Sequence, residues 1–210
     1  MPEIIGIFGG TFDPVHNGHT ETISHLMTLI PFKKVIVVPD VRPPHRQEAI
    51  GSFEDRLAMT RLAFKNHKKV SVEELGASIS GPSYAISTVK EILKKERNIK
   101  IVVIVGSDAF AEIDSWYRWK ELLRLVNFVV MKRPGHITPK NKKSFKLINQ
   151  KNEIDELVQK RGAGKVVEVK VKPLRISSSG IRENLGNGID INLLVGPKVR
   201  EYLISNKLYV

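Results

Sequence analysis

Short apolar runs separated by helical patterns are the feature that most limits the fold of this chain. Several runs lack the apolar–polar alternation of a half-exposed strand, as in Lys-Ile-Val-Val-Ile-Val at 100–105. Parallel strands that are covered on both faces have this composition. Strand candidates are 3–8, 34–38, 70–72, 100–105, 126–131 and 165–171; helix candidates are 19–30, 54–65, 84–97, 119–125, 145–161, 179–186 and 197–206. The alternation predicts an α/β fold with a doubly wound, Rossmann-like parallel sheet.

The length of 210 residues suits one α/β domain, and the 41% hydrophobic residues supply a sizeable core. We therefore expect a single domain over 1–210. A stretch rich in Pro, Gly, Lys and Asn, followed by a charged helical pattern, interrupts the regular pattern. This stretch predicts a basic variable excursion at about 135–173 rather than a second domain.

The composition excludes several classes of protein. The chain has no cysteine, which rules out disulfides and thiol catalysis and fits a reducing compartment. It has no run of 18 apolar residues and no evident signal peptide. We therefore expect a cytoplasmic protein with no membrane partner, and the oligomeric state is left open.

The net charge of +12 is unevenly distributed, because residues 132–172 carry twelve Lys/Arg against four Asp/Glu. Such a segment is either a solvated surface or a surface for polyanions. Its single aromatic residue is Phe145, and binding of single-stranded nucleic acid usually requires several. We expect no nucleic-acid partner, and a nucleic-acid-binding protein on this fold remains an alternative.

The stretch 7–19, Ile-Phe-Gly-Gly-Thr-Phe-Asp-Pro-Val-His-Asn-Gly-His, lies between a predicted strand and a predicted helix. Glycines at such a turn let backbone N–H groups approach an anion, and the helix N-terminus attracts negative charge. His16 and His19, at i and i+3, share one face and can point at the same phosphate. A tight turn with two capping histidines is the structural alternative. The full combination favours a nucleotide phosphate site.

A second motif, Ile-Ser-Ser-Ser-Gly-Ile-Arg at 176–182, also follows a predicted strand and opens a helix. Its hydroxyls, the N–H groups of the helix start and Arg182 one turn later would form a second anion site. Taken alone, the motif has a structural alternative, a serine-rich helix cap with a surface arginine.

Two further segments carry candidate ligand contacts. Arg42-Pro43-Pro44-His45-Arg46 predicts a stiff basic loop that could clamp a phosphate, unless it is an ordinary surface turn. Gly106-Ser107-Asp108 follows the strand candidate at 100–105, where Asp108 could accept hydrogen bonds from a ribose. Trp116 could stack on a pyridine ring, or it could be a packing residue.

These motifs resemble a known family. His-x-Gly-His after Gly-Gly-Thr-Phe-Asp-Pro, together with Ile-Ser-Ser-Ser-x-x-Arg, is similar to the HIGH superfamily of nucleotidyltransferases. Pro-Pro-His-Arg at 43–46, Gly-Pro-Ser-Tyr at 81–84, the Trp116 block and Arg133-Pro134-Gly135 resemble the bacterial nicotinate-nucleotide adenylyltransferases. The chain departs from that family at Ala85, where Thr is usual, and at Arg46, where Lys is usual.

The resemblance implies transfer of the adenylyl group of ATP to nicotinate mononucleotide, which gives nicotinate adenine dinucleotide and pyrophosphate in NAD biosynthesis. ATP and nicotinate mononucleotide are the implied partners, with Mg²⁺ bound mainly through ATP and no metal ligand from the protein. A pantetheine-phosphate adenylyltransferase is the nearest alternative, against which Val15-His16 and the Trp116 block argue. The residues alone leave nicotinate and nicotinamide open.

The resemblance also implies roles for individual residues. Catalysis is expected from His16, His19 and Arg182. ATP is expected to contact Gly9, Gly10, Thr11, Phe12, Gly18, Gly106, Asp108, Ile176, Ser177, Ser179 and Arg182. The mononucleotide is expected to contact Asp13, His45, Arg46, Ser83, Tyr84, Trp116 and Arg133.

Overall fold

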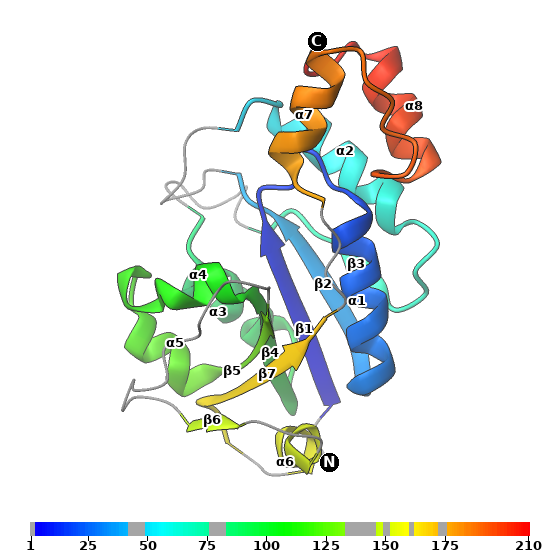
Figure 1. The fold of residues 1–210 in the computed structure, drawn as a ribbon. Coiled ribbons are helices and arrows are strands. Elements are labelled where there is room, and N and C mark those ends of the chain that lie inside the picture. Colours follow the sequence, from blue (N-terminus) through cyan, green and yellow to red (C-terminus); the bar gives the residue numbers. More distant parts are fainter. Residues whose placement is uncertain are drawn as a thin grey trace.

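The computed structural model describes residues 3–41, 49–75, 83–132, 146–148, 152–159, 162–171 and 176–210. These residues form a seven-stranded sheet of order β3-β2-β1-β4-β5-β7-β6, in which every neighbouring pair is parallel (Figure 1). The strands are β1 (Glu3–Gly10), β2 (Phe32–Pro39), β3 (Val70–Val72), β4 (Ile99–Gly106), β5 (Asn127–Lys132), β6 (Lys146–Ile148) and β7 (Lys165–Lys170).

Helices cover both faces of this sheet (Figure 1). One face is packed against α1 (Asn17–Leu29), α2 (Phe53–Phe64), α6 (Asn152–Gln159), α7 (Ser178–Gly186) and α8 (Pro197–Ser205). The other is packed against α3 (Ala85–Lys95), α4 (Ser107–Ala111), the short 3₁₀ helix η1 (Ile113–Ser115) and α5 (Trp119–Leu125). None of the described helices is both long enough and apolar enough to span a membrane.

Successive residues of the central strands enter opposite cores. In β4, Val102 and Ile104 belong to the core under α1 and α2, whereas Val103 and Val105 belong to the core under α3 and α5. Burial on both faces explains why the strand sequence has no polar alternation. The predicted doubly wound parallel sheet is therefore confirmed.

Most predicted elements are present with similar boundaries, but one predicted helix is wrong and two short helices were missed. The predicted helix over 145–161 is wrong, because β6 occupies Lys146–Ile148 and pairs with Lys165–Val167 of β7, and α6 begins only at Asn152. A three-residue segment with only two apolar residues, Leu147 and Ile148, carries too little periodicity to distinguish a strand from a helix. Helix α4 and the 3₁₀ helix η1 were not predicted.

The segments that follow β1 and β4 lie where the strand order changes direction. From β1 the chain proceeds outward to β2 and β3, and then returns to β4 on the other side of β1. Loops at the carboxyl ends of β1 and β4 consequently diverge and leave a crevice, which is the usual ligand site in such sheets. The 7–19 motif and Gly106-Ser107-Asp108 both lie at this edge.

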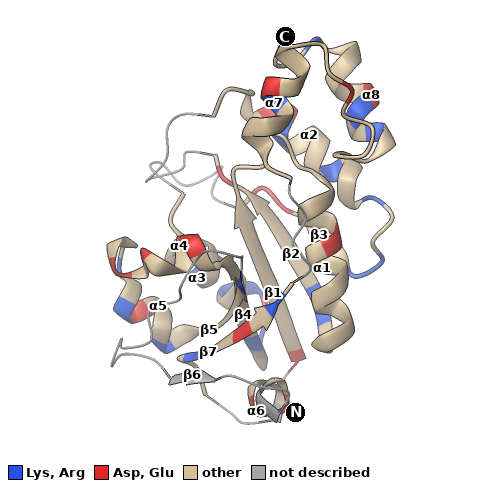
Figure 2. Ribbon diagram, viewed as in Figure 1, with Lys and Arg blue, Asp and Glu red and all other residues tan. Residues whose placement is uncertain are grey.

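Charge on the described residues is mixed, with Lys, Arg, Asp and Glu on both sides of the sheet (Figure 2). The basic segment 132–172 is described only at 132, 146–148, 152–159 and 162–171. The interpretation of its charge therefore stays a prediction, as does the expected single domain.

Candidate active site

The two histidines of the first motif lie together at the start of α1. His16 is the N-cap residue, and its backbone N–H donates to Nδ1 of His19 over 3.2 Å. Their rings stack with centroids 3.7 Å apart and planes inclined by 27°. Because Nδ1 of His19 is the acceptor, a neutral His19 carries its proton on Nε2. His19 is thereby prepared to donate a hydrogen bond from Nε2.

The aromatic rings explain two of the glycines in this motif. Phe12 is buried with a φ of +49°, and its ring meets that of His19 edge-on at 5.0 Å. A Cβ at Gly10 would lie 3.1 Å from the Phe12 ring, and a Cβ at Gly18 would lie 2.9 Å from the His16 ring. Gly10 and Gly18 therefore leave room for the rings of Phe12 and His16. The sequence analysis had explained the glycines only by the approach of an anion to the backbone. Their contact with ATP stays a prediction.

The second motif opens α7 as expected. Ser177 is the N-cap, and its Oγ accepts a hydrogen bond from the backbone N–H of Gly180 over 3.1 Å. Its Oγ also lies 3.2 Å from Oγ of Ser179. Ile176 precedes the cap. The hydroxyls of Ser177 and Ser179 thus lie side by side at a helix N-terminus, where an anion is favoured.

Hydrogen bonds join the two motifs directly. Ser178 Oγ donates to the carbonyl oxygen of Pro14 over 2.9 Å, and Nη1 of Arg182 donates to the carbonyl oxygen of Asp13. These partners are 164 and 169 residues apart in the sequence. Both predicted phosphate sites therefore belong to one continuous surface.

Asp13 lies in a buried junction, and its side chain is only 8% exposed. Its Oδ2 accepts from the N–H of Ile50 over 2.9 Å, and its Oδ1 accepts from the N–H of Gly51 over 3.0 Å and from the Tyr209 hydroxyl over 2.6 Å. Nη1 of Arg182 lies 3.6 Å from Oδ2. Both carboxylate oxygens are thus engaged by the protein. This geometry supports a structural role for Asp13, and its contact with the mononucleotide stays a prediction.

Arg56 is a site residue that sequence reasoning missed. The residue is 2% exposed. Its guanidinium donates to the carbonyl oxygens of Thr11 at 2.7 Å, Asp40 at 2.9 Å and Gly51 at 3.2 Å. Burial lowers its pKa, and the nearby Asp13 opposes that shift. Its burial could have been predicted from the sequence, because Arg56 is three residues before Met59 and so lies on the same, buried face of α2.

A cavity of about 380 Å³ lies beyond the ends of β1 and β4. Of the predicted residues it is lined by Gly9, Gly10, Ser83, Tyr84, Asp108 and Trp116. Sequence reasoning missed Tyr117, whose ring lies 4.5 Å from that of Tyr84. It also missed Asp40 and Glu112, which with Asp108 make carboxylates part of the wall.

The remaining predicted residues fall into two groups. Gly106 ends β4 and is the N-cap of α4, and it does not line the cavity. Ser83 does line it, and its Oγ accepts a hydrogen bond from the N–H of Val41 over 3.1 Å. His45, Arg46 and Arg133 lie outside the described residues. Among the described residues, no cluster of three or more acidic or imidazole side chains could hold a metal ion.

The chain is similar to known proteins over most of its length. The model of the cytidylyltransferase-like family matches residues 7–184. A protein of Buchnera aphidicola named "probable nicotinate-nucleotide adenylyltransferase" is 34% identical over 211 residues, with 100% of this chain and 97% of that protein covered. A protein of the same name from Hydrogenovibrio crunogenus is 30% identical over 206 residues, with 98% and 97% covered.

A solved structure shows the same fold. It is the Plasmodium falciparum nicotinic acid mononucleotide adenylyltransferase complexed with NaAD, and it superposes with a TM-score of 0.74 at 21% identity. The superposition covers 99% of this chain and 97% of that one.

Proposed function

The chain belongs to the cytidylyltransferase-like family, and we propose that within it the protein is a nicotinate-nucleotide adenylyltransferase. It transfers the adenylyl group of ATP to nicotinate mononucleotide and releases pyrophosphate. The observation that supports this best is the direct joining of the two phosphate motifs, through Ser178 to Pro14 and Arg182 to Asp13, next to a cavity of about 380 Å³.

ATP is expected to lie along the joined motifs. The α-phosphate would contact His16 and His19 at the start of α1, with Thr11 and the backbone of the glycine turn beside it. The β- and γ-phosphates would meet the start of α7, where Ser177, Ser179 and Arg182 provide hydroxyls, N–H groups and a cation. Two helix N-termini then face one triphosphate, an arrangement that stabilises negative charge.

The chemistry needs no nucleophile from the protein. The 5′-phosphate of the mononucleotide is already an anion, so that one of its oxygens attacks the α-phosphorus of ATP. A new P–O bond forms, the bond to the β-phosphate oxygen breaks, and that oxygen leaves with pyrophosphate. The protein's task is to align the two phosphates and to stabilise charge on the transferring and leaving groups. His19, with its proton on Nε2, suits the first role, and Arg182 suits the second.

The mononucleotide is expected to occupy the cavity. Trp116, with the adjacent Tyr84–Tyr117 pair, offers flat aromatic surfaces of the kind that stack on a pyridine ring. Ser83 and Asp108 provide polar contacts in the same wall. His45, Arg46 and Arg133 would hold the anionic end, as the family resemblance implies.

The magnesium ion enters as part of the substrate MgATP. Mg²⁺ keeps several waters and takes phosphate oxygens as ligands, so it does not need a cage of protein carboxylates. Its charge would neutralise the phosphates alongside Arg182 and the two helix N-termini.

A substrate comparison tests the proposal. Pyrophosphate release is measured with MgATP and, in turn, nicotinate mononucleotide, nicotinamide mononucleotide and 4′-phosphopantetheine, and kcat/KM is compared. We expect the highest value with nicotinate mononucleotide. Release only with 4′-phosphopantetheine, or with none of the three, would contradict the assignment.

A further inference from the structure

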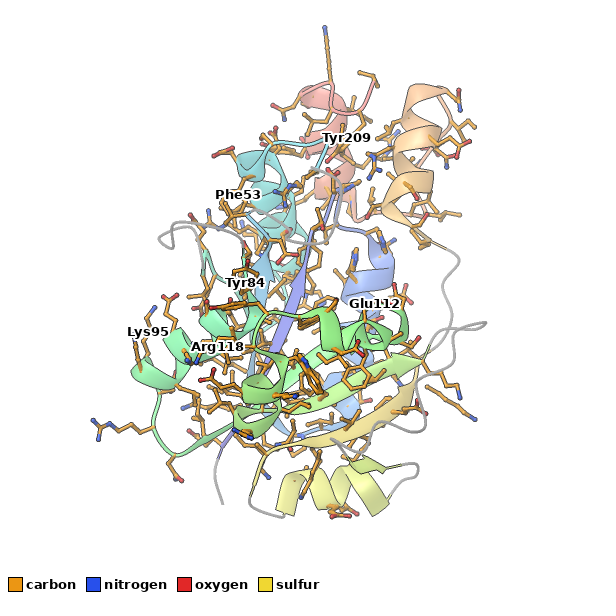
Figure 3. The ribbon with its side chains drawn as sticks, turned by 90° about the vertical axis from the view of Figure 1, so that its left-hand side faces the viewer. Phe53, Tyr84, Lys95, Glu112, Arg118 and Tyr209 are labelled. Carbon is orange, nitrogen blue, oxygen red and sulfur yellow. The ribbon has the colours of Figure 1, made fainter. Side chains whose placement is uncertain are left out.

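The hydroxyl of Tyr209 forms a short hydrogen bond to the active-site loop. It donates to Oδ1 of Asp13 over 2.6 Å, across 196 residues of sequence. In Figure 3, Tyr209 lies near the start of α2 and beside α8. Burial and the hydrogen bond to Asp13 both raise the pKa of Tyr209, so its hydroxyl remains a donor at neutral pH.

The partner of Tyr209 is also the partner of Arg182. Nη1 of Arg182 donates to the backbone oxygen of Asp13 and lies 3.6 Å from its Oδ2. A movement of the Asp13 side chain or backbone would therefore change the direction of the guanidinium. Tyr209, Asp13 and Arg182 form a chain of contacts in which the last member belongs to the phosphate-binding surface.

Gly51, which also contacts Asp13, leaves the space that the Tyr209 hydroxyl occupies. A Cβ at Gly51 would collide with the Tyr209 hydroxyl and would lie 2.9 Å from Oδ1 of Asp13. Gly51 also donates its N–H to the same oxygen over 3.0 Å. A side chain at residue 51 would therefore displace the Tyr209 hydroxyl from its present position.

A second tyrosine offers a contrast. The hydroxyl of Tyr202 donates to Oδ1 of Asp55 over 2.9 Å and so joins α8 to α2. Asp55 otherwise contacts Ser52, the cap of α2. This pair links two helices in the same part of the molecule, and the hydrogen bonds of its two side chains involve neither phosphate motif.

We propose that Tyr209 is a positioning residue for adenylyl transfer: through Asp13 it holds Arg182 in the direction that grips the departing pyrophosphate. The inference rests on the proposed function. It assigns Tyr209 no contact with substrate, so its effect must appear in the parameters that depend on Arg182.

The reverse reaction gives the sharpest measurement, because pyrophosphate is then a substrate with its own KM. The assay measures the conversion of nicotinate adenine dinucleotide and pyrophosphate to ATP and nicotinate mononucleotide, for the Tyr209→Phe variant and for the wild type. We expect the KM for pyrophosphate to rise about tenfold, the scale of one hydrogen bond to a charged group. The KM for the dinucleotide should stay within about twofold.

Matched variants separate positioning from stability. Tyr202→Phe removes an equivalent tyrosine–aspartate hydrogen bond, and it should lower the melting temperature while leaving the KM for pyrophosphate unchanged. Gly51→Ala, which crowds both the Tyr209 hydroxyl and Oδ1 of Asp13, should also raise the KM for pyrophosphate. Circular dichroism at the assay temperature establishes that each variant is folded.

A double-variant cycle tests the route through Arg182. Tyr209→Phe should add little to the KM for pyrophosphate when Arg182 is already Ala, because interacting residues are not additive. Full additivity, or a wild-type KM for pyrophosphate in folded Tyr209→Phe, would overturn the inference. A wild type that forms no nicotinate adenine dinucleotide would instead contradict the proposed function, so the two failures are distinguishable.

Discussion

At the scale of single residues, the direction of His19 is set by the backbone that caps its own helix. The N–H of His16 donates to Nδ1 over 3.2 Å, which leaves the proton of a neutral ring on Nε2. The ring is held between His16 at 3.7 Å and Phe12 at 5.0 Å. His19 therefore acts as a fixed donor, and fixed donors are the groups that stabilise developing charge most effectively.

Replacement of His19 tests this role. His19→Ala should lower kcat by roughly 10²–10³, the usual cost of removing one preorganised donor. His25→Ala, which alters an exposed residue of the same helix, is the matched control and should leave kcat unchanged. Steady-state kinetics with saturating substrates measures both. Near-wild-type turnover for His19→Ala would remove the histidine from the mechanism.

Gly18 makes a second prediction at this scale. A Cβ there would lie 2.9 Å from Cε1 and Nδ1 of His16, so the imidazole must shift. Because His16 stacks on His19, Gly18→Ala should lower kcat by about tenfold or more with little change in melting temperature. Gly196→Ala is the control, since a Cβ there meets nothing within 4 Å. Unchanged kcat in Gly18→Ala would show that His16 has room to move.

The individual residues also show which parts of the site the sequence reveals. The Ser177 cap was predictable because its partner, Gly180, is three residues away. Arg56 and Tyr209 were not, because their partners lie far along the chain: Thr11 is 45 residues from Arg56, and Asp13 is 196 residues from Tyr209. Local patterns reveal caps and turns, whereas junctions between distant segments depend on topology.

At the scale of elements, the central strands were predictable because burial on both faces leaves continuous apolar runs, as at β4. The edge strand β6 was not predictable. β6 has three residues and gains its strand conformation by pairing with β7. Nothing within Lys146–Ile148 specifies that pairing, so a longer helix was the wrong interpretation of 145–161.

Helix α6 is attached to strands β4 and β7 by two lysines. Lys100, at the start of β4, is 6% exposed, and its Nζ donates to the carbonyl oxygens of Leu157 and Val158 in the last turn of α6. Lys165 of β7 donates to Glu156 O over 3.0 Å. Cations at a helix C-terminus satisfy carbonyl groups that have no partner within the helix.

Lys100→Met should therefore destabilise the protein by about 1–3 kcal/mol, because two carbonyl groups lose a charged donor while the side-chain volume is nearly kept. Lys165→Met, which removes a donor to one carbonyl, should cost less. Urea unfolding measures both values. Kinetic constants of Lys100→Met should match the wild type, since α6 lies far from the carboxyl ends of the strands (Figure 1). Equal stability of Lys100→Met and the wild type would contradict the anchoring role.

At the scale of the whole molecule, the sheet order brings the two phosphate motifs together. The first motif follows β1 at the centre of the sheet, and the second follows β7, three places along it. The last two helices, α7 and α8, then fold back over the face that carries α1 and α2. Recognition of both motifs in the sequence indicated a common site, but only the topology provides the Ser178–Pro14 and Arg182–Asp13 contacts.

The hydrogen bond from Tyr209 to Asp13 also joins the two ends of the chain, and it makes the free energy of unfolding depend on pH. The pKa of Tyr209 is raised in the folded protein by burial and by the Asp13 hydrogen bond, whereas the unfolded chain ionises its phenol near the ordinary value of about 10. Below that pH both states hold the proton, so the stabilisation is fully present. Above it the unfolded chain releases the proton first, and unfolding becomes more favourable.

The free energy of unfolding of Tyr209→Phe should therefore lie below that of the wild type by a constant amount up to about pH 9. Above about pH 10 the difference should shrink by as much as about 1.4 kcal/mol per pH unit. Other ionisable groups are common to both proteins, and their contributions cancel in this comparison. Denaturant unfolding at a series of alkaline pH values measures the difference. If it stays constant through about pH 11, the phenol ionises equally in both states, and the bond to Asp13 does not contribute to holding the ends of the fold together.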